Sequence, residues 1–194
     1  MSERILVLVA LSVILAMVFG TGMRIRHPTA APSLRTDLML KSDPTRPLAS
    51  VASIDAKGES KPLNERITRP TVITYWATWC IPCLRELPTF LGFKPMAEAA
   101  GVDLITISED KEGVEHARKF LEEKGLTALP FLTDADGSVA KATRVKGLPT
   151  AIIVNGKGEE VARMEGEADW GTKETLDVVI ELLGMGSAAP VAGR

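Results

Sequence analysis

The sequence predicts an α/β domain in which helices flank a central mixed sheet, and three observations lead to this prediction. Strand-like and helical segments alternate through the middle of the 194-residue chain. Both of its cysteines, Cys80 and Cys83, come directly after the apolar run at residues 72–76, which places them between a strand and a helix. Two further apolar runs flank the turn at residues 155–158, which predicts a hairpin of antiparallel strands.

Residues 1–26 are predicted to be a membrane anchor or an export signal. The stretch at residues 5–23 is uncharged and lies between Arg4 and Arg24. As a helix it would span about 28 Å, close to the hydrocarbon thickness, so we expect a retained single-pass membrane anchor. Small residues at 20–22 leave open the alternative of a cleaved signal peptide. Either interpretation places the globular part outside the cytoplasm.

The segments on both sides of the core are predicted from their composition. Four prolines at residues 27–47 predict an irregular tether, and residues 187–194 are expected to be a flexible tail. The domain between them is residues 48–186. Residues 48–54 and the turn at 55–58 predict an added N-terminal β-hairpin.

Leaving aside a short helix before the third strand, the core elements are predicted in the order strand, helix, strand, helix, strand, strand, helix, from hydrophobic periodicity and from glycine and proline positions. They are a strand at 72–76, a helix at about 81–96 that Pro88 should kink or interrupt, a strand at 102–107, a helix at 112–124, a short helix from the Asp-rich turn at 133–137 to about Thr143, strands at 150–154 and 160–164, and a last helix with an apolar stripe of Leu176, Val179, Ile180 and Leu183.

The Cys-x-x-Cys motif is typical of a redox-active dithiol. Two intervening residues allow the thiols to close a small disulfide ring, and a helix N-terminus lowers the pKa of a thiol placed there. Cys80, expected to be the exposed thiol, is therefore predicted to be the nucleophile. Cys83 lies one turn into the helix on nearly the same face and is predicted to resolve a mixed disulfide formed at Cys80.

Two other interpretations of the dithiol are weaker. A zinc site needs four ligands, and outside the pair the histidines are only His27, in a polar segment, and His116, in a charged helix. We therefore expect no metal site and no cofactor. A purely structural disulfide would close too short a loop to contribute much stability.

Five segments of the chain match one known family: the cysteine-containing run at 76–83, Glu86 with Pro88, Gly147-Leu148-Pro149-Thr150 before an apolar strand, the hairpin turn at 155–158, and Gly166-Glu167-Ala168-Asp169-Trp170. Through these segments the chain resembles the TlpA/ResA-like membrane-anchored thiol:disulfide oxidoreductases of the thioredoxin superfamily, over about residues 49–184. This resemblance implies a thioredoxin-like fold and protein-disulfide reductase activity. It also implies that the N-terminal stretch lies in the inner membrane with the catalytic domain facing the periplasm, or that the protein is soluble in the periplasm if the stretch is cleaved.

The resemblance also implies roles for residues outside the two thiols. Glu86 would tune or deprotonate the pair, taking over from the buried acid of thioredoxin, whose position is Thr74 here; a solvated residue paired with Arg85 is the alternative. Pro149 would form a cis bond opposite the dithiol and offer its neighbour's backbone to an extended substrate; a simple turn is the alternative. The residues expected to bind the substrate are Trp79, Ile81, Pro82, Leu148 and Pro149. Trp76 is a weaker candidate. For both tryptophans the alternative is that the side chain packs in the core.

Charge and composition favour protein partners. The formal net charge is −2, and no basic patch supports nucleic-acid binding. The expected partners are periplasmic proteins with disulfides, such as metalloprotein or cytochrome oxidase assembly factors, and a membrane electron donor that re-reduces the dithiol. The alternatives are reduction of apocytochrome c during cytochrome c maturation and a dithiol carrier of copper or zinc.

Overall fold

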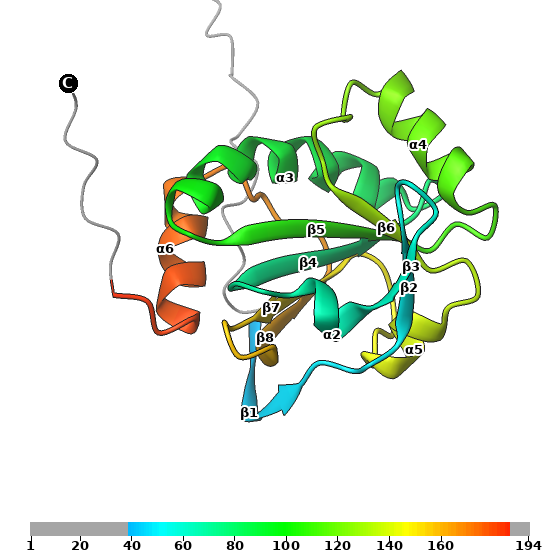
Figure 1. Cartoon of the computed structure of the whole chain (residues 1–194). Helices are drawn as coiled ribbons and strands as arrows, with labels where there is room; N and C mark the ends of the chain where they lie inside the picture. Colours follow the sequence, from blue (N-terminus) through cyan, green and yellow to red (C-terminus); the bar gives the residue numbers. More distant parts are fainter. Residues whose placement is uncertain (1–38, 187–194) are drawn as a thin grey trace, which may run out of the picture. The chain divides into compact units, whose positions relative to one another are not determined.

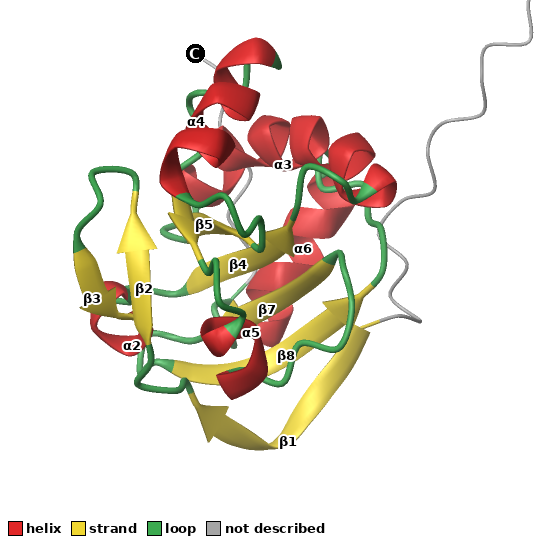
Figure 2. Ribbon diagram, turned by 90° about the vertical axis from the view of Figure 1, so that its right-hand side faces the viewer, coloured by secondary structure: helices red, strands yellow, loops and turns green. Residues whose placement is uncertain are grey.

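The computed structural model describes residues 39–186, which form an eight-stranded mixed sheet with helices on both faces (Figures 1 and 2). The sheet order is β1-β8-β7-β4-β5-β6-β2-β3. Strands β4, β5 and β6 are parallel, and β7 lies antiparallel to β4 on its other side. The strands are β1 (Met39–Pro47), β2 (Ala52–Asp55), β3 (Ser60–Pro62), β4 (Thr71–Trp76), β5 (Asp103–Ser108), β6 (Phe131–Thr133), β7 (Thr150–Val154) and β8 (Glu159–Glu165).

The helices divide between the two faces of the sheet. Helices α3, α4 and α6 cover one face, and α2 and α5 lie against the other (Figure 1). Their bounds are α2 (Leu63–Arg66), α3 (Ile81–Ala99), α4 (Val114–Glu123), α5 (Ser138–Ala142) and α6 (Lys173–Leu182). The predicted central sheet flanked by helices is therefore confirmed.

Strand β4 is buried on both faces because it lies in the middle of the sheet. Its side chains alternate, so Val72 and Trp76 enter the core under α3, α4 and α6, while Ile73 and Tyr75 enter the core under α2 and α5. An apolar run of this kind is typical of a central strand. The strand fixes the position of the segment that follows it, which carries both cysteines.

Helix α3 is continuous through Pro88, so of the two predicted effects of this proline, a kink or an interruption, the interruption was wrong. Proline removes one helical hydrogen bond, but Pro88 lies on the exposed face of α3, where water can satisfy the freed carbonyl. The opposite face is held in the core by Phe90 and Phe93, whose rings lie 5.3 and 5.6 Å from the Trp170 ring. The core packing of these aromatic rings stabilises α3 by more than the one backbone hydrogen bond lost at Pro88 destabilises it.

Two strands differ from the sequence-based prediction. Residues 39–47 form strand β1 against β8, so the predicted irregular tether was wrong for this part of the segment at 27–47. β1 is an edge strand with an irregular register between Lys41 and Arg46, and both features accommodate prolines. The three-residue strand β6 was not predicted, because so short a segment has no measurable periodicity.

The added N-terminal hairpin is confirmed as β2 and β3, which pair antiparallel at the far end of the sheet. The carboxylate of Asp55 accepts hydrogen bonds from the N–H groups of Lys57 and Glu59, and Gly58 provides the positive φ of 83° that the turn requires.

The predicted anchor at residues 1–26 and the predicted tail at residues 187–194 lie outside the described residues. Among residues 39–186, no helix has the length and apolar character to cross a membrane.

Candidate active site

The dithiol lies where β4 passes into α3. A tight turn connects them, closed by a hydrogen bond of 3.1 Å from the N–H of Cys80 to the carbonyl oxygen of Ala77. Cys80 is the N-cap residue of α3, and its Sγ accepts the backbone N–H of Cys83 at 3.3 Å. A disulfide joins the two residues. The sulfur of Cys80 thus lies at the positive end of a 19-residue helix, where a thiolate is stabilised.

The surface around the dithiol is apolar, although the thiols themselves are covered. Trp79 and Ile81 are 68% and 65% exposed, whereas Cys80 is only 5% and Cys83 1% exposed. The expectation that Cys80 is exposed was therefore wrong for this disulfide form, because its sulfur turns inward to Cys83 and its helix terminus. Trp76 belongs to the core, where its ring lies 5.6 Å from that of Phe120.

Glu86 is a buried carboxyl, one helical turn beyond Cys83 on α3. Its side chain is 2% exposed and accepts hydrogen bonds from the hydroxyl of Thr74 and from the N–H of Ala168, both at 3.1 Å. Burial raises the pKa of Glu86 to about 7, and the backbone hydrogen bond from Ala168 opposes this shift. The solvated ion pair with Arg85 considered from the sequence is therefore excluded.

Arg85 instead binds the loop that follows β8. Its guanidinium Nε donates to both carboxylate oxygens of Glu167 at 2.9 and 3.1 Å. This hydrogen-bonded pair holds the pKa of Glu167 below its usual range. The two neighbouring residues of α3, Arg85 and Glu86, thus fix the same loop at Glu167 and Ala168, one at the surface and one in the core.

Pro149 lies beside the start of the dithiol segment. Thr150 pairs with Tyr75 in antiparallel register, so the preceding Pro149 lies opposite Trp76, the last residue of β4. The Leu148–Pro149 peptide bond is cis, and Pro149 is buried. Pro149 is therefore brought close to the dithiol segment in space, 66 residues after Cys83 in the sequence.

Asp110 is a further residue of this region that the sequence analysis did not identify. It follows β5, is completely buried, and accepts hydrogen bonds from the backbone N–H and hydroxyl of Thr78, two residues before Cys80. The sequence could have indicated this contact, because Asp110 and Thr78 each follow a predicted strand, and the carboxyl ends of neighbouring parallel strands meet at one edge of a sheet.

Glu109, the residue before Asp110, is half-buried. Burial, together with the nearby carboxylate of Asp134, raises the pKa of Glu109 to about 8.

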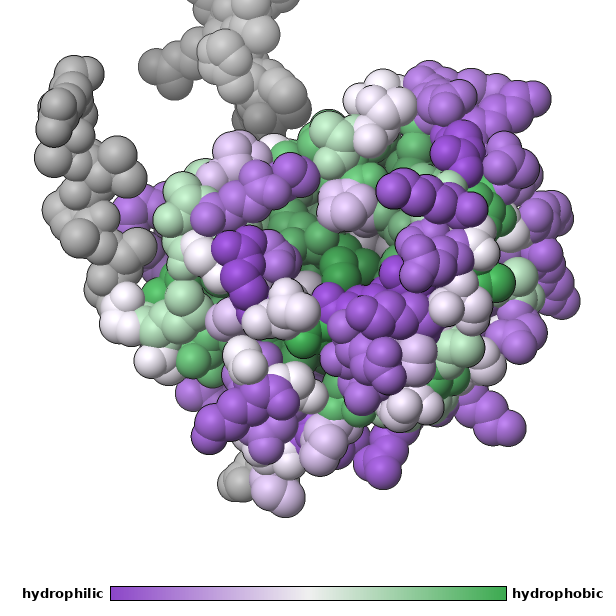
Figure 3. Space-filling view, viewed as in Figure 1, coloured by the Kyte–Doolittle hydropathy of each residue, from purple (hydrophilic) through white to green (hydrophobic). Residues whose placement is uncertain are grey.

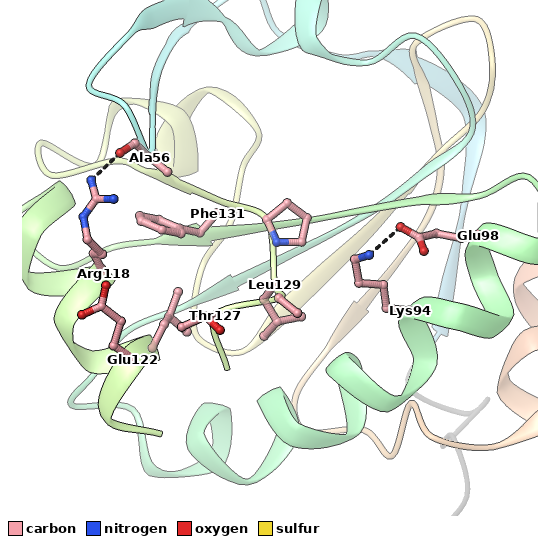
Figure 4. Close-up of a pocket in the computed structure, with 11 residues that line it drawn as sticks. Ala56, Lys94, Glu98, Arg118, Glu122, Thr127, Leu129 and Phe131 are labelled. Carbon is pink, nitrogen blue, oxygen red and sulfur yellow. Dashed lines mark hydrogen bonds and ion pairs between the residues drawn. The ribbon is translucent and has the colours of Figure 1, made fainter. Parts of the chain in front are cut away.

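A pocket of about 550 Å³ lies among α3, α4 and the segment leading into β6 (Figure 4). Leu129 and Phe131 contribute apolar lining, and the guanidinium of Arg118 donates a hydrogen bond to the carbonyl oxygen of Ala56. Hydrophilic side chains cover much of this side of the molecule, with hydrophobic ones in recesses between them (Figure 3). The lining residues of this pocket include neither cysteine.

Comparison with known proteins connects this geometry to an activity. The family model described as Redoxin matches residues 35–180, which include both cysteines. The thiol-disulfide oxidoreductase ResA of Geobacillus kaustophilus is 32% identical over 129 residues, covering 66% of this chain and 70% of that protein. The sporulation thiol-disulfide oxidoreductase A of Bacillus subtilis is 30% identical over 91 residues, covering 46% and 54%.

Solved structures show the same architecture. A thio-disulfide isomerase from Thermus thermophilus superimposes with a TM-score of 0.59 at 27% identity, covering 75% of this chain and 98% of that one. StoA from Bacillus subtilis gives a TM-score of 0.56 at 23% identity, covering 69% and 98%. The sheet and helices described above are therefore those of a known fold.

Proposed function

This chain belongs to the Redoxin family and is a thiol:disulfide oxidoreductase with a thioredoxin-like fold, and on that basis we propose that Cys80 and Cys83 are its reacting thiols. The observation that supports this assignment most directly is the position of Cys80 as N-cap of α3, with its sulfur accepting a backbone N–H of the first turn. The exposed Trp79 and Ile81 on either side provide an apolar surface for a partner protein.

The proposed reaction proceeds through two thiol–disulfide exchanges. In the reduced protein, the Cys80 thiolate attacks a disulfide of the partner, forming a mixed disulfide and releasing one partner thiolate. Cys83 then loses its proton and attacks the Cys80 sulfur, which forms the Cys80–Cys83 disulfide and releases the second partner thiolate. Two electrons pass to the partner, and a dithiol donor must then reduce the Cys80–Cys83 disulfide.

Glu86 is the group we propose as proton acceptor for Cys83. It lies on the same helix one turn away, and its pKa of about 7 allows it to bind and release a proton near neutral pH. Thr74 and Ala168 hold its two carboxylate oxygens in place. A proton taken from Cys83 would therefore be held inside the protein rather than exchanged directly with solvent.

We propose that partner proteins dock on the exposed Trp79 and Ile81 and the half-buried Pro82 and Leu148, with the buried Pro149 behind them holding the backbone of Leu148 in place. Replacing the exposed Trp79 with alanine should slow reduction of a protein disulfide, such as that of insulin, by about tenfold or more, because a docking aromatic is lost. Reduction of a small disulfide, which needs no such surface, should change little. Leu40→Ala, at a 54% exposed residue on edge strand β1, is the matched control. Equal slowing of both substrates would contradict the docking role.

The in vivo role we propose is reduction of periplasmic proteins that assemble metal centres, such as cytochrome oxidase assembly factors.

The cellular location we propose is the inner membrane, with residues 5–23 as the anchoring helix and residues 39–186 in the periplasm. The uncharged 19-residue stretch supports the anchor. Alkaline carbonate washing of membranes from cells that make the full chain tests it, since a released protein would be extracted.

The redox potential tests the proposed direction of electron flow. A protein that reduces partner disulfides needs a potential below theirs, and we expect about −200 to −270 mV on equilibration with glutathione. A value near about −120 mV would identify an oxidant and contradict the proposed direction.

A further inference from the structure

Asp110 is a fully buried carboxyl beside the dithiol, and the exchange chemistry described above does not use it. Both of its oxygens accept the backbone N–H of Thr78, at 3.1 and 3.0 Å. One oxygen also accepts the Thr78 hydroxyl at 2.8 Å, and the other accepts the hydroxyl of Ser108 at 2.9 Å. Every donor available from Thr78 is therefore directed at this one side chain.

Thr78 lies in the turn that carries Cys80. The hydrogen bond from Cys80 to Ala77 closes the turn, and Thr78 and Trp79 are its two central residues. Trp79 is 68% exposed and makes no hydrogen bond in the described part of the chain that would fix its position. Of these two central residues, only Thr78 makes side-chain hydrogen bonds within residues 39–186, and both oxygens of Asp110, two residues after β5, accept from it.

His116 on α4 extends this contact. Its Nε2 lies 3.2 Å from the Thr78 hydroxyl oxygen. A hydroxyl has one proton, and the Asp110 carboxylate can only accept, so the Thr78 proton is directed to Asp110. His116 therefore donates to Thr78 through Nε2. The turn is held from two sides, by β5 through Asp110 and by α4 through His116.

We infer that Asp110 is a positioning residue, which fixes the turn at residues 77–80 through Thr78 and thereby places the Cys80 sulfur at the N-terminus of α3 for attack. This inference rests on the proposed role of Cys80 as the nucleophile. A displacement of about 1 Å at a reacting atom can slow a reaction by about 10²-fold, so the position of this turn matters for the rate.

Asp134 provides a matched control, because it is also buried and also accepts backbone N–H groups. Its carboxylate accepts those of Val139 and Ala140 at 3.0 and 2.8 Å and so caps α5 on the opposite face of the sheet. The charged or titratable groups near Asp110 are Glu112 and His116, whose side chains offer ligand atoms within 4.8 Å of its carboxylate, and the adjacent Glu109. Substitutions at Asp110 leave all three in place.

The test measures the alkylation rate of Cys80 in the reduced protein from pH 5 to 9, together with the thermal stability of each variant. Asp110→Ala removes both the acceptor and the charge, and it should slow alkylation at pH 7 about tenfold and shift the pH profile. Asp110→Asn removes the charge but retains an oxygen that can accept from Thr78, so its rate should stay within about threefold of wild type. Asp134→Ala should lower stability and leave the profile unchanged.

Other outcomes would overturn the inference. Equal changes in Asp110→Ala and Asp110→Asn would show an effect of charge rather than position, and wild-type profiles for both would show no effect of Asp110. If Asp110→Ala does not fold, Asp110→Leu decides, because it has a similar length but no acceptor for the Thr78 N–H or hydroxyl: a slowed and shifted profile with the wild-type profile retained in Asp110→Asn supports the inference, and a wild-type profile in both overturns it. Preferential alkylation of Cys83 in the wild-type protein would count against the proposed nucleophile instead.

Discussion

Replacement of Cys80 with serine is expected to abolish insulin reduction, and replacement of Cys83 with serine to trap the protein in a mixed disulfide with its partner. The Cys80→Ser variant has no thiolate at the helix N-terminus to attack the partner disulfide. The Cys83→Ser variant retains that attack but has no thiol to resolve the product. The loss of turnover should exceed about 10³-fold in both variants, because a hydroxyl at ordinary pKa does not replace a thiolate.

The two serine variants differ in what they accumulate, which makes the assignment testable. Incubation of each variant with a disulfide-containing protein and non-reducing electrophoresis should show a stable adduct for Cys83→Ser and little for Cys80→Ser. The reverse pattern would make Cys83 the attacking thiol. Both variants should remain folded, since the bridge spans only three positions of the sequence and contributes little to stability.

Replacement of Glu86 with glutamine is expected to make stability less dependent on pH. In the folded protein the pKa of Glu86 is raised from 4.5 to about 7, so the folded state holds its proton more tightly than the unfolded state does. The resulting stabilisation is complete below pH 4.5 and is lost as pH rises through about 7. The shift corresponds to about 3 kcal/mol at most. Glutamine can keep the contacts with Thr74 and Ala168 and carries no charge to bury.

Thermal unfolding of the oxidised proteins from pH 4 to 9 measures this effect. Glu86→Gln should match wild type near pH 4.5 and become more stable than wild type above pH 7. Glu181→Gln, at an exposed residue of α6, is the control and should follow the wild-type curve throughout. A constant difference between Glu86→Gln and wild type at every pH would contradict the raised pKa.

The same variant separates a catalytic from a structural role of Glu86. If Glu86 accepts the proton of Cys83, Glu86→Gln should slow the resolving step on the order of 10²-fold and prolong the mixed disulfide at Cys80. Stopped-flow measurement from pH 5 to 9 detects this. If the rate of the resolving step depends on pH in the same way in wild type and Glu86→Gln, Glu86 has no part in proton transfer and only holds the loop at Ala168.

Local sequence patterns were sufficient for the centre of the fold and the position of the dithiol. The apolar run of β4 and the turn between β7 and β8 are complete signals within a few residues. Cys80 and Cys83 needed only their spacing and the strand before them to be recognised. The low exposure of Cys80 was not predicted, because it depends on the disulfide with Cys83.

The contacts that surround the dithiol depend on the order of strands, which no local pattern provides. Asp110 reaches Thr78 across 32 positions of sequence because β4 and β5 are neighbours. Glu86 meets Ala168 across 82 positions, and its burial follows from that loop rather than from the α3 sequence. Strand β1 was missed for a related reason, since its prolines are acceptable only at the edge of a sheet.

The central claim is that Cys80, at the N-terminus of α3, is the attacking thiol. The most direct test is to reduce the native protein, expose it briefly to a limiting amount of iodoacetamide near pH 7, and identify the modified cysteine by peptide mass spectrometry. We predict that Cys80 carries nearly all of the label, because the N-terminus of α3 stabilises its thiolate. Predominant labelling of Cys83 would contradict the account.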